Sequence, residues 1–369
     1  MKILVTGGVG FIGSHLVDAL IEKDHDVTMY DYLEPQVHAK QPDYLNQSAD
    51  FVRGDIRDRN NLKEVVEDAD VIFHQAAMVG VGQSMYQIEK YVDVNTLGTA
   101  KLLDILANEE HDVKKLIVAS SMSIYGEGKY ECEDCGIVYP KLRPEEQLKN
   151  REWEMICPNC GKIVRPVSTD ENKPLQPTSI YAITKKDQEE MCLLTGRTYG
   201  IPTVALRYFN VYGPRQSLSN PYTGVCAIFS SRIKNDKPPL IFEDGLQTRD
   251  FVSVKDIAQA NLLAMENSRM NYGSFNVGTG SPISILSIAD TLIRLYGKAL
   301  KPEIVNKYRS GDIRHCYADV SKIKKLGFKP QISFEQGMKE LVEWGESQEA
   351  VDRFEEAHRE LVSKGLVEQ

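Results

Sequence analysis

Short apolar runs alternate with longer stretches of helical periodicity along the first part of the chain. The runs that we predict to be strands cover residues 2–6, 27–31, 51–53, 71–74, 116–120 and 204–208. Apolar runs that show no polar face are typical of strands buried on both sides, and strands that alternate with helices form parallel sheets. The pattern therefore predicts an α/β fold with a doubly wound parallel sheet of the Rossmann type.

The turn after the first predicted strand is rich in glycine and opens a helix of apolar periodicity. Gly7 would permit a tight turn, Gly10 would let the backbone approach a pyrophosphate, and Gly13 would allow close packing of the helix. Unpaired N–H groups at the helix start, around Phe11 and Ile12, would attract that anion. The spacing G-x-x-G-x-x-G has one residue more than that of the two-domain dehydrogenases. These residues predict a dinucleotide site.

The second predicted strand ends in Asp31, 18 residues after Gly13. A carboxylate at this place accepts a hydrogen bond from the adenosine ribose. The residues that follow, Tyr32 to Glu34, include no arginine to bind a 2′-phosphate. The sequence therefore favours NAD over NADP.

Ligands of doubly wound sheets lie at the carboxyl ends of the strands, so the residues that end the other predicted strands are further candidates. They are Asp55, Ile56, Gln75, Ala76, Ala77, Ser120, Ser121 and Asn210. His74 also lies there, but a histidine at such a position more often packs or caps, and we assign it no chemistry.

A later helix is predicted to begin at Thr178 or Ser179 and to carry Tyr181 and, one turn further, Lys185. Residues four apart share one helix face, and a nearby ammonium lowers the pKa of a phenol. Tyr181 could then act as a general base. The spacing alone is weak evidence, because it also occurs in Tyr86 with Lys90 and in Tyr125 with Lys129.

The chain has 369 residues and a formal net charge of −9, which suits one major domain and a smaller second one. Excess negative charge argues against nucleic acid as a partner. No apolar run approaches the ~20 residues of a membrane span, and the first strand leaves no room for a signal peptide. We therefore expect a cytoplasmic protein without a membrane partner.

Four of the seven cysteines form two C-x-x-C-G pairs, Cys132 with Cys135 and Cys157 with Cys160. In a reducing compartment such pairs favour a structural, four-thiolate zinc ribbon, with a disulfide-linked or redox-active loop as the alternative. Residues 131–165 hold six basic and seven acidic residues, so this segment is not expected to bind nucleic acid. We expect it to pack near the mouth of the active site, as a lid or as a dimer contact.

Together these motifs closely resemble the extended short-chain dehydrogenase/reductases, in their NAD-dependent nucleotide-sugar epimerase/dehydratase group, and most closely the UDP-glucose 4-epimerase type. The resemblance runs from residue 1 to about 330 and is interrupted once, by the cysteine-containing segment. It rests on residues 6–13, Asp31, residues 55–56 and 74–77, Asn95, residues 120–121 and 125–126, Tyr181, Lys185 and residues 206–214.

The resemblance implies that Ser121, Tyr181 and Lys185 are catalytic. Ser121 would bind the sugar hydroxyl that is oxidised, the Tyr181 phenolate would remove its proton, and Lys185 would hold the nicotinamide ribose and depress the pKa of the tyrosine. The cofactor-binding set implied is Gly7, Gly10, Phe11, Ile12, Gly13, Asp31, Asp55, Ile56, Gln75, Ala76, Ala77, Asn95, Ser120, Tyr181 and Lys185.

Family dehydratases carry an acidic pair after the catalytic hydroxyl residue, where this chain has Met122 and Ser123. A decarboxylase of the group would also be expected to show an acid near Ser123. We therefore favour a 4-epimerase of UDP- or dTDP-hexoses that works through a transient 4-keto sugar. The alternatives are a dehydratase, decarboxylase or oxidoreductase of the same family, or a non-catalytic sensor of NAD or a nucleotide sugar.

The resemblance also divides the chain. Residues 1–130 and 167–213 would form the NAD-binding domain around the insertion at 131–166, and residues 214–369 would bind the nucleotide sugar, with a return to the sheet near 250–278. In that second domain the family implies substrate contacts by Asn210, Arg249, Arg309 and Asp312, although each arginine taken alone could be a surface ion pair. Cys316 falls where galactose epimerases limit the pocket size, and its small side chain hints at a bulkier sugar.

The family usually forms homodimers through the helix after Asn95 and the tyrosine helix, and we expect the same here. The apolar positions that fit this, or an internal face equally well, are Leu97, Leu102, Leu103, Ile105 and Leu106. The charged segment from Phe334 onward is predicted to be a solvated helix.

Overall fold

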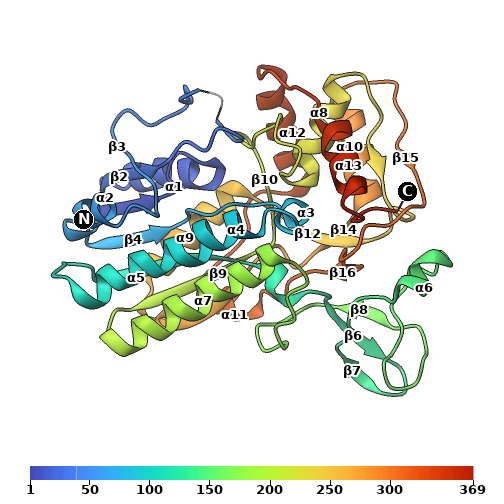
Figure 1. Cartoon of the computed structure of the whole chain (residues 1–369), viewed down its shortest axis with the longest axis horizontal. Coiled ribbons are helices and arrows are strands. Elements are labelled where there is room, and N and C mark those ends of the chain that lie inside the picture. The colour runs from blue at the N-terminus through green and yellow to red at the C-terminus, as the bar shows by residue number, and fades with distance from the viewer. Residues whose placement is uncertain (39, 369) are drawn as a thin grey trace.

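The computed structural model describes residues 1–38 and 40–368. Within them, seven strands form a central sheet in the order β13-β9-β5-β4-β1-β2-β3, with all neighbours parallel (Figure 1). The strands are β1 (Lys2–Thr6), β2 (Asp26–Asp31), β3 (Asp50–Arg53), β4 (Val71–His74), β5 (Lys115–Ser121), β9 (Thr203–Tyr208) and β13 (Gly273–Val277). This is the doubly wound parallel sheet that the apolar runs predicted.

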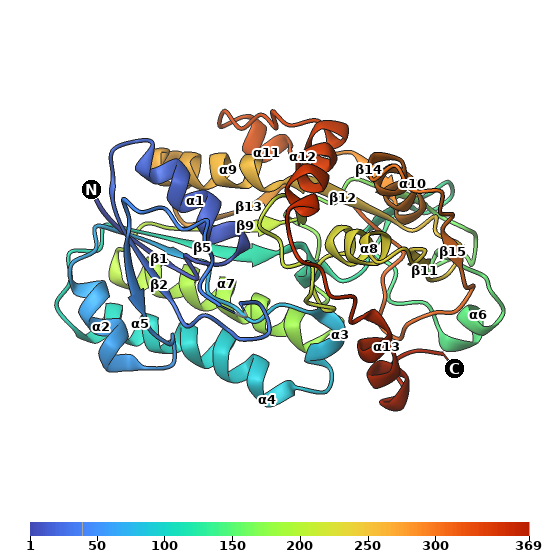
Figure 2. The ribbon, with the colours of Figure 1, turned by 90° about the horizontal axis from the view of Figure 1, so that it is seen from above.

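Helices cover both faces of this sheet (Figure 2). On one face lie α1 (Phe11–Ile21), α9 (Val254–Glu266) and α11 (Ser321–Lys324); on the other lie α2 (Arg59–Glu67), α4 (Ile88–Tyr91), the π-helical η1 (Val92–Leu97), α5 (Gly98–Asn108) and α7 (Ile180–Tyr199). Ile3 and Val5 of β1 point into one core and Leu4 into the other. Each such side chain contributes roughly 1.5–3 kcal/mol through burial, which explains why the strand runs show no polar face.

Four of the five positions considered for a dimer interface serve this internal packing instead. Leu102, Leu103, Ile105 and Leu106 are buried in the core between α5 and the sheet. Leu97 alone among the five is exposed.

A second domain lies at the carboxyl ends of the strands. It contains β10 (Asn210–Tyr212), β11 (Leu240–Ile241), β12 (Thr248–Ser253), β14 (Pro282–Ser284), β15 (Glu303–Ile304), β16 (His315–Cys316), α8 (Val225–Lys234), α10 (Ile285–Leu295), α12 (Phe334–Glu346) and α13 (Phe354–Ser363). The prediction of a solvated helix from Phe334 onward is wrong. Helix α12 buries Met338, Leu341 and Val342 in the core of this domain, because its charges occupy one side only.

The inserted segment forms a small lobe at the lower right of Figure 1. Its strands β6 (Lys129–Cys132), β7 (Gly136–Val138) and β8 (Arg165–Val167) make an antiparallel sheet, and α6 (Glu145–Lys149) lies on the connection between β7 and β8. Tyr130, Val138, Met155 and Val164 form its core. In the described part of the chain, no helix is both long and apolar enough to span a membrane.

Candidate active site

A cavity of about 650 Å³ lies at the carboxyl ends of the sheet strands, between the two domains. That volume falls in the range of small-molecule sites. The predicted site residues that line it are Gly7, Gly10, Phe11, Ile12, Gly13, Asp31, Asp55, Ile56, Gln75, Ala76, Ala77, Ser120, Ser121, Tyr181, Lys185, Asn210, Arg249, Arg309 and Asp312. Residues that are far apart in the sequence therefore meet in one place.

The geometry of the first turn confirms the predicted tight turn at Gly7 and close helix packing at Gly13, while the approach of a pyrophosphate at Gly10 stays a prediction. Gly7 has a φ of +70°, which disfavours other residues. A Cβ on Gly13 would lie 2.1 Å from the Gly7 carbonyl oxygen, so α1 packs against the turn only with glycine there. A Cβ on Gly10 would meet only that same oxygen, at 3.3 Å, on the side that borders the cavity. Gly10 is also the N-cap of α1 and provides no side chain, so the first N–H groups of the helix are left for a ligand.

Two carboxylates are fixed at the same edge of the sheet. Asp31 accepts hydrogen bonds from the backbone N–H groups of Val9 (3.1 Å) and Leu33 (2.8 Å). Asp55 is paired with Arg57, with 2.5 Å between Oδ2 and Nη2, and lies beside Ile56 in the cavity wall. Both acids are held by the protein before any ligand arrives.

Asn95 supports the site from behind and does not line the cavity. Its Oδ1 accepts from the Met78 N–H (2.7 Å), and its Nδ2 donates to the Met78 carbonyl and to Thr184 Oγ1 (3.0 Å each). Asn95 is fully buried. It therefore fixes the backbone that follows Ala77 and ties it to α7, which corrects the expectation of direct cofactor contact.

Tyr181 lies in the first turn of α7, close to Ser121. The helix begins as predicted, because Ser179 is its N-cap and its Oγ accepts from the Ala182 N–H (3.1 Å). Burial raises the pKa of Tyr181, while its interaction with the Ser121 hydroxyl lowers the pKa. The Ser121 Oγ also accepts from the Ser123 hydroxyl (2.9 Å). Ser121 and Tyr181 thus face the same part of the cavity.

Lys185 is buried one turn further along α7. Its ammonium donates to Gln188 Oε1 (2.7 Å), and burial lowers its pKa to about 8. Within the described residues it makes no hydrogen bond to Tyr181, so the expected depression of the tyrosine pKa by Lys185 is absent from this arrangement. Gln188 also donates to Thr99 Oγ1 (2.8 Å), which fixes its side chain. Gln188 has no sequence signature that would have revealed this role.

His74 has the packing role that was assigned to it. It is 1% exposed and bonds Thr6 Oγ1 (2.8 Å) and Thr99 Oγ1 (2.9 Å) through its two ring nitrogens. Burial lowers the pKa of His74 to about 3, so the ring is neutral.

A buried ionic network fixes the strand that carries Ser121. Ser120 donates to Glu189 Oε2 (2.5 Å), and Glu189 pairs with Arg207 (2.5 Å). Arg207 also donates to the Tyr125 hydroxyl (2.8 Å). Tyr125, one of the two alternative Tyr-Lys matches, is therefore part of this support.

The predicted substrate residues line the part of the cavity that the second domain forms. Asn210 Oδ1 is buried and has no hydrogen-bond partner among the described residues. The Arg249 guanidinium donates to the carbonyls of Thr248, Ile313 and Arg314, which fixes it at the cavity. Arg309 lies over the Phe242 ring (4.0 Å to its centre) and 4.0 Å from Asp312. Backbone carbonyls thus hold Arg249 and the Phe242 ring supports Arg309, and both arginines border the cavity.

The sequence reading missed the contribution of the C-terminal helix α13. Phe354, Ala357, His358 and Leu361 line the cavity, and their spacing of three and four residues was an available signal. From the same helix, the Glu360 carboxylate accepts from the hydroxyls of Tyr86 (2.9 Å) and Tyr222 (2.8 Å). Tyr86, the other alternative match, therefore anchors this helix.

Cys316 lies outside the described lining of the cavity. It is buried beside β12, with its Sγ 3.8 Å from Thr169 Oγ1, and it is not among the described lining residues. The side chain belongs to the buried core, and the hint of a bulkier sugar from this position stays a prediction.

The four cysteines of the insertion form a compact cluster. The Sγ atoms of Cys132, Cys135, Cys157 and Cys160 all lie within 4.8 Å of one another, and none is in a disulfide. Gly136 and Gly161, which follow the two C-x-x-C pairs, have φ values of +70° and +76°, a conformation that glycine adopts readily.

Residues 3–146 and 157–278 match the sequence model of the NAD dependent epimerase/dehydratase family. The dTDP-L-rhamnose 4-epimerase of Burkholderia thailandensis is 36% identical over 348 residues, which are 93% of this chain and 94% of that protein. A UDP-N-acetyl-alpha-D-glucosaminuronate decarboxylase of Bacillus cytotoxicus is 30% identical over 93% of this chain and 97% of its own length. The solved UDP-glucuronic acid 4-epimerase from Bacillus cereus, in complex with UDP-glucuronic acid and NAD, superposes with a TM-score of 0.77 and 29% identity, covering 94% of this chain and 99% of that one.

Proposed function

The chain belongs to the NAD-dependent epimerase/dehydratase family, and we propose that it is an NAD-dependent 4-epimerase of UDP- or dTDP-hexoses. One arrangement carries the proposal: Ser121, Tyr181 and Lys185 line the same cavity as the glycine turn. The two residues after Ser121 also line it, and neither Met122 nor Ser123 has a carboxyl group.

The residues of the cofactor half fit NAD. The uncapped start of α1 beside Gly10 suits a pyrophosphate, and Asp31 suits the adenosine ribose. Asp55 and Ile56 would face the adenine, and Lys185 the nicotinamide ribose. When bound, NAD would supply the acceptor and donor of the hydride for the sugar carbon.

The protein's own residues would orient the sugar and move one proton. Ser121 would hold the C4 hydroxyl, and the Tyr181 oxygen would take its proton as the alcohol becomes a ketone. The hydrogen bond with Ser121 lowers the pKa of Tyr181 against the effect of burial, which favours this proton transfer. The 4-keto sugar would then rotate in the cavity and present its other face. The same tyrosine would return the proton to the C4 oxygen, so no further acid is needed.

The wall of the cavity that the second domain forms would hold the nucleotide diphosphate. Arg249 and Arg309 suit its charge, Asp312 suits the ribose hydroxyls, and the unpartnered Asn210 Oδ1 calls for a donor from the ligand. This combination favours a nucleotide-sugar substrate over surface ion pairs for the two arginines.

The decarboxylase relative means that family membership alone does not select the reaction. Loss of water or carbon dioxide calls for additional acid–base groups close to the sugar. Epimerisation needs only Ser121, Tyr181 and Lys185. We therefore favour epimerisation over the other reactions of the family. A non-catalytic sensor would have no need for Ser121, Tyr181 and Lys185 together.

We also infer that the cysteine cluster holds a structural zinc ion. Thiolates at a Zn–S distance of about 2.3 Å lie roughly 3.8 Å apart on a tetrahedron, and the four thiols are already gathered on this scale. Four protein ligands leave no open position for catalysis. Metal analysis of the purified protein should find one zinc per chain; an active protein without zinc would contradict this inference.

A homodimer and a cytoplasmic location complete the proposal. Leu97, just after Asn95, and Ile183 of the tyrosine helix α7 expose apolar side chains where the resemblance places the dimer contact, and Ile88 and Val92 expose theirs just before Asn95. The thiols of the described residues are free, which suits a reducing compartment.

Incubation of the protein with UDP- and dTDP-hexoses, followed by NMR, tests the activity. We expect inversion at C4 without a released keto sugar. Tyr181→Phe should lower kcat by at least about 10² because proton transfer is lost. Tyr199→Phe, at the exposed end of the same helix, is the matched control and should retain activity. A stable 4-keto-6-deoxy product, or full activity of Tyr181→Phe, would contradict the proposal.

A further inference from the structure

The segment of residues 308–314 faces the cavity on one side and the inserted lobe on the other. Arg309 and Asp312 line the cavity, and Gly311 between them has a φ of +85°. The segment lies outside regular strands except for a single bridge of Arg309 with Val367. Backbone hydrogen bonds tie it to the end of the chain, from the Ser310 N–H to the Leu366 carbonyl (3.0 Å) and from the Glu368 N–H to the Tyr308 carbonyl (3.1 Å), and side-chain contacts on the side of the inserted lobe add to these.

The insertion contacts this segment at three successive places. Leu148 and Trp153 pack with Tyr308 in a small apolar cluster. Arg143 donates to the Asp312 carbonyl (3.2 Å). Further along, Glu154 accepts from Arg314 (2.6 Å) and lies 3.3 Å from His315.

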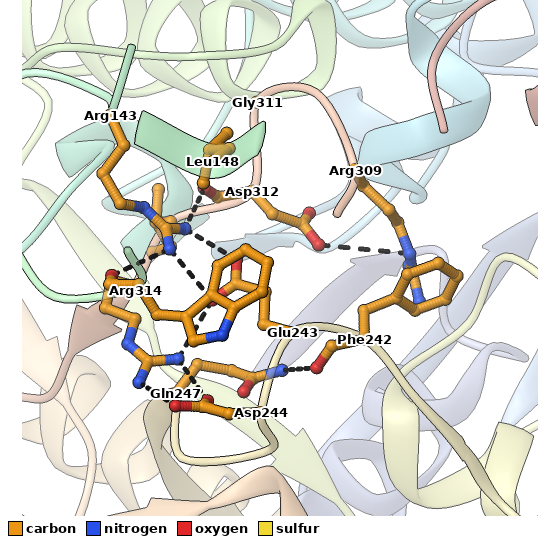
Figure 3. Close-up of polar contacts among 12 residues, drawn as sticks. Arg143, Leu148, Phe242, Glu243, Asp244, Gln247, Arg309, Gly311, Asp312 and Arg314 are labelled. Atoms are coloured by element: carbon orange, nitrogen blue, oxygen red, sulfur yellow. Dashed lines mark hydrogen bonds and ion pairs between the residues drawn. The ribbon is translucent and has the colours of Figure 1, made fainter. Parts of the chain in front are cut away.

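A buried cluster of charges joins these contacts to Phe242 and Glu243, which also line the cavity (Figure 3). Arg143 binds Glu243 with both of its Nη atoms (2.9 and 2.7 Å), and Arg314 donates to Glu243 (3.0 Å) and to Asp244 (2.7 Å). The side chains of Arg143, Glu243 and Arg314 are 1%, 4% and 0% exposed. Phe242, on which Arg309 lies, directly precedes Glu243.

We propose that the inserted lobe positions the nucleotide-sugar site, with Arg143 and Glu154 as positioning residues that set the places of Arg309 and Asp312. A buried pair does not tolerate the loss of one partner, because the remaining charge stays in a nonpolar environment. Without Arg143, Glu243 would keep Arg314 alone of these two charged partners, and the Asp312 carbonyl would lose the Arg143 donor, so the segment would shift. The inference rests on the proposed role of Arg309 and Asp312 in binding the substrate.

The effect should appear in substrate affinity. The Ser121, Tyr181 and Lys185 region is held by α7 and the sheet, and among the described residues no hydrogen bond joins Arg143 or Arg314 to either of them. Displacement of a binding group by about 1 Å can cost up to 10²-fold. We therefore expect Arg143→Met to raise KM for the nucleotide sugar at least about tenfold, with kcat changed by less than about threefold and NAD content unchanged.

The experiment measures KM, kcat and NAD content, and also titrates UDP and dTDP into each protein by calorimetry. The matched control is Lys149→Met in the same lobe, because Lys149 pairs only with the exposed Glu145 among the described residues. This control should match the wild type, and Arg143→Lys should lie between wild type and Arg143→Met. An Arg143→Met protein with wild-type KM and wild-type nucleotide affinity would overturn the inference.

The calorimetry separates this inference from the proposed function. A wild-type protein that binds UDP or dTDP without inverting C4 would refute the epimerase activity, and the affinity of Arg143→Met would still decide the positioning role. If circular dichroism shows that Arg143→Met is unfolded, Glu154→Gln decides instead. Its partly exposed pair with Arg314 predicts a nucleotide affinity about threefold weaker, and an unchanged affinity would overturn the inference.

Discussion

The buried Lys185 should make the protein less stable while serving its activity, and Lys185→Met tests this directly. Its side chain is buried in the cavity wall, with Gln188 Oε1 as its partner at 2.7 Å. Methionine has a similar length and carries no charge. We therefore expect the variant to be more stable than the wild type at neutral pH and to lose turnover.

The magnitude follows from the pKa of the lysine. Burial lowers it from 10.5 to about 8. Because one pKa unit corresponds to about 1.4 kcal/mol, keeping the ammonium charged at pH 7 costs the fold roughly 3 kcal/mol. The variant also loses the hydrogen bond to Gln188, which reduces its gain in stability by about 1 kcal/mol. Lys185→Met should therefore be about 2 kcal/mol more stable than the wild type at pH 7.

The sign of the pH dependence is fixed by the direction of the shift. The folded-state pKa is depressed, so the cost is full below pH 8 and disappears as the pH rises through 8 toward 10.5. At pH 9.5 the cost has fallen to roughly 1.5 kcal/mol, and the two proteins should be nearly equal in stability.

Urea unfolding of the nucleotide-free proteins at pH 7 and pH 9.5 measures the difference, and the C4 inversion assay measures activity. The neighbouring Lys186→Met is the control, because Lys186 is only paired at the surface with Glu190. A Lys185→Met protein that is less stable than the wild type at pH 7 would refute the reasoning. A stability difference that is the same at both pH values would refute it too.

Two further predictions concern the glycine turn and the cysteine cluster. Gly13→Ala should lower the free energy of unfolding by about 3 kcal/mol, because its Cβ would lie 2.1 Å from a backbone oxygen, whereas Gly10→Ala should cost less than about 1 kcal/mol and weaken NAD binding at least tenfold. Unfolding curves and NAD titrations compare the two, and equal effects on both properties would argue against separate roles. Removal of zinc by a chelator should open the insertion to solvent, so that Cys132, Cys135, Cys157 and Cys160 react with a thiol reagent while the buried Cys192, Cys226 and Cys316 stay protected. A chelator that leaves thiol reactivity unchanged would contradict a zinc site.

The parts of the site that sequence predicted are those with local signals. The roles of Gly7 and Gly13 follow from backbone geometry, and the start of α7 follows from the capping side chain of Ser179. The end of each apolar run located the cavity, because parallel strands bring their carboxyl ends to one edge. These features depend on few neighbours in the sequence.

The parts that sequence did not predict depend on contacts between distant segments. Nothing near Arg143 indicates that it binds Glu243, 100 residues away. Asn95 matches the family pattern, yet only the folded chain shows that it bonds Met78 behind the cavity wall. Cys316 has the right position in the sequence, but the direction of its side chain is set by the packing of β16 against β12.

The fate of the hydrogen at C4 tests the proposed reaction most directly. A nucleotide hexose labelled with deuterium at C4 is incubated with the protein, and NMR follows the label in the product. Oxidation and reduction by one retained cofactor predict a C4-inverted product that keeps its deuterium at C4. Deuterium at C6 of a 4-keto-6-deoxy sugar, or loss of the label to solvent, would contradict a 4-epimerase.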